Sequence, residues 1–164
     1  MQGFEFSCPT KIVCGAHALD KLPDEVADRG MKHPLVMTDA GLVKLGVAAK
    51  LTGVLDAADV PYEVFDQVPP DSSMDVVNEV ARLYAARGCD GFVAIGGGSV
   101  MDATKAAAWL AANTVGDPRQ IYKGLRHPPL PVALVGTSAG TGSEVTGTAV
   151  LTVDADGRKK SING

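Results

Sequence analysis

The stretch "AIGGGSVMDATKAAAWLAA", residues 94–112, places three consecutive glycines between a short apolar run and an alanine-rich segment. The apolar run predicts a strand, and the segment that Ser99 opens predicts a helix. A glycine turn between a parallel strand and a helix lets backbone N–H groups approach a phosphate closely, and the helix directs its positive end toward that phosphate. We therefore interpret Gly96, Gly97 and Gly98 as candidate phosphate contacts, with a tight turn that binds nothing as the alternative.

Ser99 and Asp102 have the S-x-x-D spacing of a capping box, so a purely structural role competes with a role in ligand binding. Ser99 either caps the helix or donates to a phosphate oxygen. Lys105, on the same predicted helix, either reaches a phosphate or is a surface lysine. The turn is neither G-x-G-x-x-G nor G-x-x-x-x-G-K-[ST], which disfavours a P-loop nucleotide hydrolase.

Outward from this turn, short apolar runs alternate with helix-length segments. The pattern predicts strands at 33–39, 60–66 and 129–137, helices at 40–58 and 72–88, and a strand–turn–strand unit at 147–162 that reverses at Asp156-Gly157. Strands separated by helices imply right-handed crossovers. We therefore expect an α/β fold: a mostly parallel, Rossmann-like sheet with helices on both faces, plus a β-hairpin near the C-terminus. The β-like opening, residues 4–15, is expected to pair with that hairpin at a sheet edge.

A second polar loop, "VALVGTSAGTGSEVTGTAV" at residues 132–150, repeats the arrangement after the next predicted strand. Hydroxyl groups of Thr137, Ser138 and Thr141 gather around Gly140. The alternative is an ordinary polar loop, in which Ser, Thr and Gly are common. Because parallel strands end at the same edge of a sheet, two such loops on neighbouring strands favour a ligand site.

Composition limits the classes of function. The chain has 164 residues, a formal net charge of -4, 46% hydrophobic and 21% charged residues, which is typical of one globular domain. No basic run predicts a nucleic-acid or anionic-membrane partner. The three scattered cysteines contain no CxxC pair, and neither a signal peptide nor a membrane-length apolar stretch is present. We expect a cytoplasmic protein.

Three pieces of the chain together resemble the iron-containing (metal-dependent, group III) alcohol dehydrogenases: "TDAGLVKLG" at 38–46, "IGGGSVMDATKAAA" at 95–108 and "TSAGTGSEVT" at 137–146. The resemblance extends over essentially the whole chain. It implies the N-terminal domain of the dehydroquinate synthase-like fold, with a nicotinamide-dinucleotide-binding domain at 1–164 and the helical metal-binding domain absent from this chain. The glycine motif alone also admits a glycerol dehydrogenase-like relative.

The resemblance assigns cofactor contacts to two groups of residues. Gly97, Gly98 and Ser99 would hold the pyrophosphate, supported by Asp102. The nicotinamide-side half would be lined by Thr137, Ser138, Gly140 and Thr141.

Three further positions are implied by the same resemblance. Asp39 would accept hydrogen bonds from the adenosine ribose, and its charge would repel a 2′-phosphate, so NAD is favoured over NADP; a helix N-cap is the alternative. Asp71, in "VPPDSS", stands where relatives usually carry "PNP", a departure that leaves its contact open. Thr148 and Lys160 align with positions that face the cofactor, although a solvated hairpin lysine is the alternative for Lys160.

The family's metal ligands are one Asp and three His from the helical domain, whereas this chain has only His17, His33 and His127 and no H-x3-H pair. We therefore expect a divalent metal, iron or zinc, only in a full-length enzyme. The predicted function is that of an oxidoreductase half-domain that binds NAD(H) for alcohol oxidation or aldehyde reduction and is inactive alone. Alternatives are a stand-alone dinucleotide-binding or sensor module, and a structural domain with vestigial loops. An apolar face left for the helical domain predicts self-association into a homo-oligomer.

Overall fold

The computed structural model describes residues 3, 8–113, 127–153 and 157–163. Its main sheet contains β1 (Leu35–Met37), β2 (Glu63–Phe65), β3 (Phe92–Gly96) and β4 (Val132–Gly136), and its hairpin contains β5 (Thr148–Thr152) and β6 (Lys159–Asn163). The α-helices are α1 (Leu22–Asp28), α2 (Ala40–Lys44), α3 (Val47–Ala57), α4 (Met74–Arg87) and α5 (Gly98–Ala112). Short 3-10 helices are η1 (Ala18–Lys21) and η3 (Ser143–Val145). None of the described helices is long and apolar enough to cross a bilayer.

The main sheet is parallel, with the order β2-β1-β3-β4. The chain passes from β1 to β2 on one side and then returns to β3 on the other side of β1. The strand order therefore reverses between β1 and β3. In open α/β sheets this reversal point is where ligands bind, beyond the carboxyl ends of the strands. The predicted α/β fold with a parallel sheet is confirmed.

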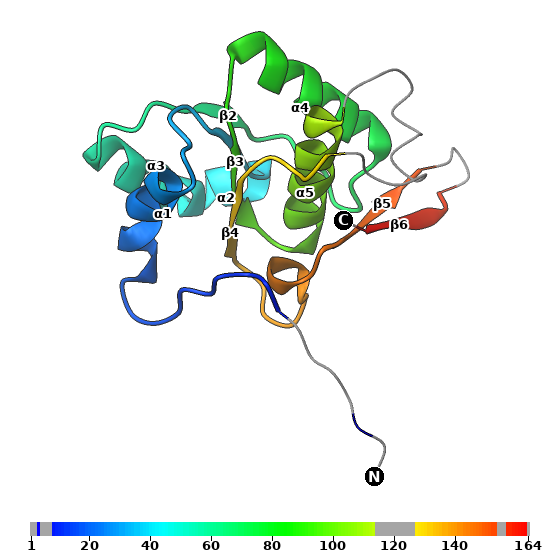
Figure 1. Cartoon of the computed structure of the whole chain (residues 1–164), viewed down its shortest axis with the longest axis horizontal. Helices are drawn as coiled ribbons and strands as arrows, with labels where there is room; N and C mark the ends of the chain where they lie inside the picture. Colours follow the sequence, from blue (N-terminus) through cyan, green and yellow to red (C-terminus); the bar gives the residue numbers. More distant parts are fainter. Residues whose placement is uncertain (1–2, 4–7, 114–126, 154–156, 164) are drawn as a thin grey trace.

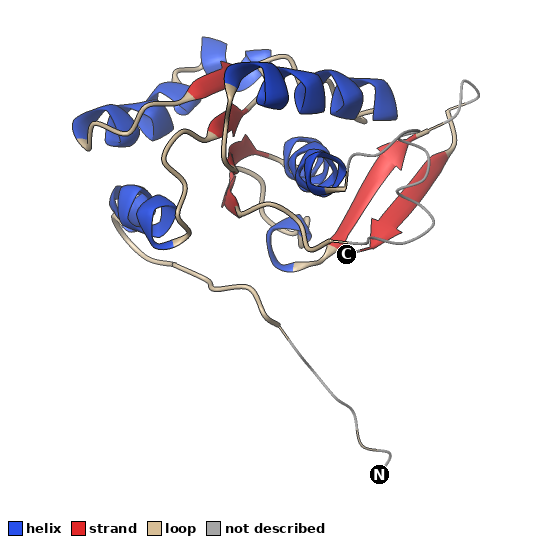
Figure 2. Ribbon diagram, turned by 45° about the horizontal axis from the view of Figure 1, so that its top comes forward, coloured by secondary structure: helices blue, strands red, loops and turns tan. Residues whose placement is uncertain are grey.

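Helices cover both faces of the sheet, as Figure 2 shows. Because successive strand residues point to opposite faces, Val36 and Val93 pack with α1 and α3, whereas Leu35, Met37 and Phe92 pack with α4 and α5. All five strand side chains are completely buried. Burial on both faces explains why these strands read as continuous apolar runs in the sequence.

The hairpin forms a separate two-stranded antiparallel sheet that lies beside α5 (Figure 1). Ala149, Leu151 and Ile162 bury their side chains against the α4 and α5 core. The predicted hairpin is confirmed, while its reversal at Asp156-Gly157 includes a residue outside the described part of the chain. Residues 8–15 contain no strand, so the expected pairing with the hairpin is absent from that part of the opening; residues 4–7 lie outside the described residues.

The predicted single helix at 40–58 is wrong. The structure has two helices, α2 and α3, separated at Leu45 and Gly46. Gly46 has φ +70, a left-handed conformation that ends α2 and starts α3. The break leaves Leu45 76% exposed. The apolar pattern continues across the break, so it did not signal the change in direction.

Helix α5 is buried along most of its length between the sheet and the hairpin. Its small alanines allow close approach to β3 and α4, and Ala103, Ala106 and Ala107 are completely buried. A helix that is apolar on all sides is expected in such an interior position. Its one lysine, Lys105, is consequently buried as well, with 7% of its surface exposed.

The edge strand β4 is only half-buried. Together with residues 10–14 it borders an open groove of about 860 Å³. Ile12 and Val13 in this segment are 63% and 36% exposed. This is apolar surface of the kind expected from the sequence, and self-association through it stays a prediction.

We expect Gly53→Ala to raise the free energy of unfolding by about 0.5–1 kcal/mol. Gly53 lies in the middle of α3, and a Cβ built there meets no atom within 4 Å. Alanine would therefore lower the entropy of the unfolded chain without a steric cost. Urea unfolding followed by tryptophan emission measures the change, and a loss of stability would contradict the prediction.

Candidate functional site

The site is built where β1 and β3 end. Asp39 follows β1 at the start of α2, and Gly97 follows β3 at the start of α5. Thr38 binds the two strand ends together, because its buried hydroxyl donates to the Ile95 carbonyl at 3.0 Å. Both helix N-termini consequently open toward the reversal point of the sheet.

An open groove of about 870 Å³ lies over these strand ends. Six of the predicted contact residues line it together: Asp39, Gly97, Gly98, Ser99, Thr137 and Ser138. They come from three separate loops, so the fold brings together what the sequence spreads over about a hundred positions. Six of the predicted contact residues thus share one groove.

The two glycine-containing loops are in direct contact. Gly96 pairs with Gly136 in the register of β3 and β4, and the Thr137 N–H donates to the Gly96 carbonyl at 2.9 Å. A Cβ on Gly97 would lie 3.2 Å from the Ser138 hydroxyl oxygen. The loop after β4 therefore forms one wall of the groove, and the turn after β3 forms the next.

The three glycines of the turn have different reasons to lack a side chain. A Cβ on Gly96 would lie 2.5 Å from the Val100 Cβ, so packing of α5 against β3 requires this glycine. At Gly98 a Cβ would meet Thr141 at 3.6 Å, an ordinary van der Waals contact. The fold has room for a Cβ there, so packing within the protein does not require a glycine at position 98.

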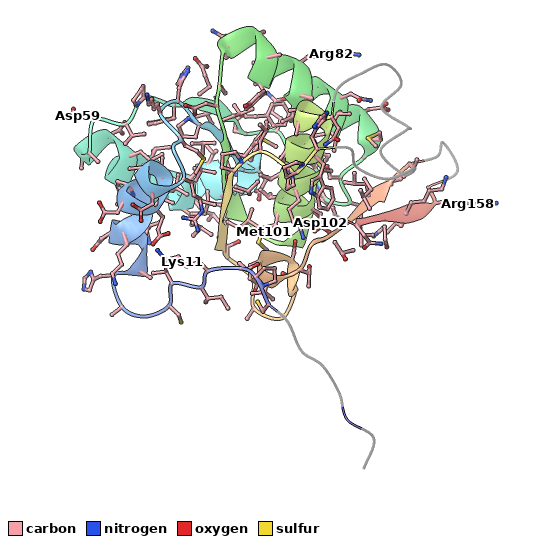
Figure 3. The ribbon with its side chains drawn as sticks, in the orientation of Figure 1. Lys11, Asp59, Arg82, Met101, Asp102 and Arg158 are labelled. Atoms are coloured by element: carbon pink, nitrogen blue, oxygen red, sulfur yellow. The ribbon has the colours of Figure 1, made fainter. Side chains whose placement is uncertain are left out.

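The expected capping box at Ser99 and Asp102 is wrong. Helix α5 has Gly97 as its N-cap residue and begins at Gly98, so Ser99 lies inside the first turn. The Ser99 hydroxyl accepts a hydrogen bond of 3.2 Å from the Asp71 N–H. The carboxylate of Asp102 turns toward η3 and β5 instead, where it accepts from the Ser143 hydroxyl at 2.6 Å and the Val150 N–H at 3.1 Å. Figure 3 labels Asp102 on α5, beside the segment that leads into β5.

Asp39 is the N-cap of α2, because its Oδ1 accepts from the Leu42 N–H at 2.9 Å. The helix N-cap role is confirmed. Asp39 also lines the groove, and a carboxylate has acceptor capacity beyond one hydrogen bond. Capping therefore leaves Asp39 able to accept from a ligand hydroxyl.

Asp71 has a left-handed backbone, with φ 52, which aspartate tolerates better than most residues. Its carboxylate forms an exposed ion pair with Lys159 of β6 at 2.6 Å, and its carbonyl accepts from the Thr152 hydroxyl at 3.3 Å. The segment that carries Asp71 is therefore tied to both the hairpin and Ser99. Its side chain faces the hairpin rather than the groove.

The loop after β4 is held by contacts of its own. The Thr141 hydroxyl donates to Glu144 Oε2 at 3.0 Å and accepts from the Ser143 N–H at 3.2 Å. Gly140 and Gly142 have φ of +90 and +67, a conformation that strongly favours glycine. These glycines are needed for the path of the loop, whether or not a ligand binds.

The surroundings of Lys105 contradict both interpretations offered from the sequence, a phosphate contact and a surface lysine. Lys105 is buried, so it is no surface lysine, and its ammonium group donates to the carbonyls of Ser143 at 2.9 Å, Thr146 at 3.3 Å and Thr148. Asp102 Oδ1 lies 3.1 Å away. An ammonium group has three N–H donors, so these acceptors leave none for a phosphate.

Several predicted contacts do not lie along the groove. Among the described residues that line the groove, seven predicted contacts are absent: Gly96, Asp71, Asp102, Gly140, Thr141, Thr148 and Lys160. Thr148 lies on β5, where its hydroxyl donates to Asn163 Oδ1 at 2.8 Å, and Lys160 lies opposite Leu151 on β6. Cofactor contact by these residues stays a prediction.

Two groups of residues were missed in the sequence. Residues 66–70, after β2, also line the groove, and their Pro69-Pro70 pair marked only a loop. Lys159 was not singled out as the partner of Asp71. The burial of Lys105 had a signal, because it interrupts a segment that is apolar on every side and so had to be buried.

Among the residues that the structure describes, no group of three or more His, Cys, Asp or Glu side chains could hold a metal ion. The described residues thus do not fit the metal that the resemblance implies.

The fold and the site define an α/β domain with two glycine-rich loops at the reversal point of a parallel sheet. The family model described as iron-containing alcohol dehydrogenase matches residues 9–164. The chain belongs to this family.

Relatives and solved structures agree with this assignment. Lactaldehyde reductase of Escherichia coli K12 is 36% identical over 151 residues, which cover 90% of this chain and 39% of the relative. NADH-dependent butanol dehydrogenase A of Thermotoga maritima has a TM-score of 0.90 at 28% identity, over 100% of this chain and 42% of that one. Sulfoacetaldehyde reductase of Bifidobacterium kashiwanohense, solved in complex with NAD+, has a TM-score of 0.89 at 29% identity. The match covers 100% of this chain and 44% of that one. The chain therefore spans about 40% of the length of the relatives it matches.

Proposed function

We propose that residues 1–164 are a nicotinamide-dinucleotide-binding domain of an alcohol or aldehyde oxidoreductase. The observation that carries the proposal is Gly98, whose missing side chain the packing of the protein does not require. Its backbone lies in the first turn of α5, where N–H groups have no acceptor within the helix. Such a helix start attracts the diphosphate of a dinucleotide.

The groove suggests how the cofactor would lie. Gly97, Gly98 and Ser99 would donate to the diphosphate, and Asp39 would accept from the adenosine ribose. Thr137 and Ser138, on the other wall, would face the nicotinamide half. The solved complex of the Bifidobacterium sulfoacetaldehyde reductase with NAD+ supports this choice of ligand.

When bound, the nicotinamide ring would accept or supply a hydride, with a small alcohol or aldehyde as the second reactant. This chain would bind and orient the cofactor, while a helical domain with the metal ligands would complete the enzyme. On this proposal the chain alone binds NAD(H) and does not turn over.

Isothermal titration of the 164-residue chain with NADH tests the proposal. We expect saturable binding with one site per chain. Heat changes no larger than dilution, at NADH concentrations up to several millimolar, would instead favour a structural domain.

Asp39→Gly is expected to lower the preference for NADH over NADPH by about tenfold, or roughly 1.4 kcal/mol. The change removes the charge that would repel a 2′-phosphate. Glycine at an N-cap costs helix α2 only a few tenths of a kcal/mol relative to aspartate. Parallel titrations with NADH and NADPH measure the ratio, and an unchanged ratio would mean that Asp39 is only a cap.

A further inference from the structure

Outside the groove, Lys105 has an ammonium group that is buried although it is charged. Its side chain is 8% exposed, and that of Asp102 is 15% exposed. Burial lowers the pKa of Lys105, and the neighbouring Asp102 opposes that effect. An ion pair in such a position is costly to desolvate and contributes little net stability compared with an apolar pair. Its contacts therefore suggest a role beyond stability.

Those contacts all lead to one segment. Lys105 donates to the carbonyls of Ser143, Thr146 and Thr148, and Asp102 accepts from the Ser143 hydroxyl and the Val150 N–H. The two side chains, one helical turn apart on α5, thus grip the chain from η3 to the middle of β5. The same helix begins at the glycine turn.

We propose that Lys105 and Asp102 are positioning residues that hold the loop after β4 in register with the glycine turn. This inference rests on the proposed function, because it concerns the nicotinamide side of the same groove. On this inference neither residue needs to contact the cofactor. Both act through Ser143.

The connection from Ser143 to the groove is continuous. Its N–H donates to the Thr141 hydroxyl at 3.2 Å, and Thr141 lies 3.6 Å from the position of a Cβ on Gly98. The Ser138 hydroxyl oxygen, earlier in the same loop, lies 3.2 Å from the position of a Cβ on Gly97. Release of Ser143 would let this wall of the groove move relative to the glycine turn. The wall at Asp39 would remain in place.

This asymmetry gives a test that a general loss of stability does not imitate. AMP would use Asp39 and the glycine turn, whereas NADH would also need the wall that carries Thr137 and Ser138. For Lys105→Met, which keeps the length of the side chain but has no donor, we expect the Kd for NADH to rise about tenfold. The Kd for AMP should stay within about twofold.

Lys50→Met, at an exposed position of α3, is the matched control and should change neither Kd. If Lys105→Met shows no cooperative unfolding by Trp109 emission, Asp102→Asn carries the test, with a threefold or larger rise in the Kd for NADH alone. An equal rise in the Kd for both ligands, or an unchanged Kd for NADH, would overturn the inference. If the wild-type chain binds no NADH, the proposed function fails and the inference fails with it, a result distinct from either outcome in the variants.

Discussion

Replacing Gly98 by valine is expected to weaken NADH binding about 100-fold, or roughly 2.7 kcal/mol, while the protein stays folded. The side chain would enter the space in which a diphosphate would contact the first turn of α5. Space in the unliganded protein is adequate at the Cβ, which would lie 3.6 Å from Thr141. Alanine, which adds only that Cβ, should cause a smaller loss of about tenfold.

The matched control for this prediction is Gly53→Ala, which replaces a glycine of α3, a helix on the opposite face of the sheet. It should leave the Kd for NADH unchanged. Unfolding followed by the emission of Trp109, the single tryptophan and 3% exposed, verifies that each variant is folded. Full NADH affinity in a folded Gly98→Val variant would contradict the account of the glycine turn.

Gly96→Ala is expected to lower the free energy of unfolding by about 2–3 kcal/mol, whether or not a ligand is present. Its Cβ would lie 2.5 Å from the Val100 Cβ and 2.6 Å from Val100 Cγ2. The clash would force β3 and the first turn of α5 apart at the centre of the sheet. Such overpacking costs more than the small gain in strand propensity that alanine brings.

Urea denaturation with Trp109 emission measures this second effect. Gly98→Ala is its control, since the neighbouring glycine has room for a methyl group and its variant should lose less than about 0.5 kcal/mol. If both variants were equally unstable, the assignment of one glycine to packing and the other to ligand binding would be wrong.

The parallel sheet could be predicted because its central strands are buried on both faces. Residues 35–37 and 92–95 are therefore continuous apolar runs, each followed by a polar or glycine-rich turn. The break between α2 and α3 could not be predicted, because the apolar pattern continues across it. Only the positive φ of Gly46 separates two short helices from one long helix.

Part of the site followed from the same reasoning. Asp39, Gly97 and Ser138 line one groove, as expected when parallel strands end at a common edge. The S-x-x-D spacing gave a wrong prediction for Asp102. An aspartate is equally suited to a capping box and to a contact with a distant hairpin, so the residue type does not distinguish the two. Only the tertiary structure shows that its carboxylate meets Ser143, 41 residues along the chain.

Amide chemical shifts during an NAD+ titration test the central claim most directly. In a 1H–15N correlation spectrum of the 164-residue chain, we expect saturable shifts at Gly97, Gly98 and Ser99, followed in size by Thr137 and Ser138. Amides of α3 should not move. Saturable shifts confined to another surface, or none at all at the start of α5, would contradict the claim that this helix holds the diphosphate of a dinucleotide.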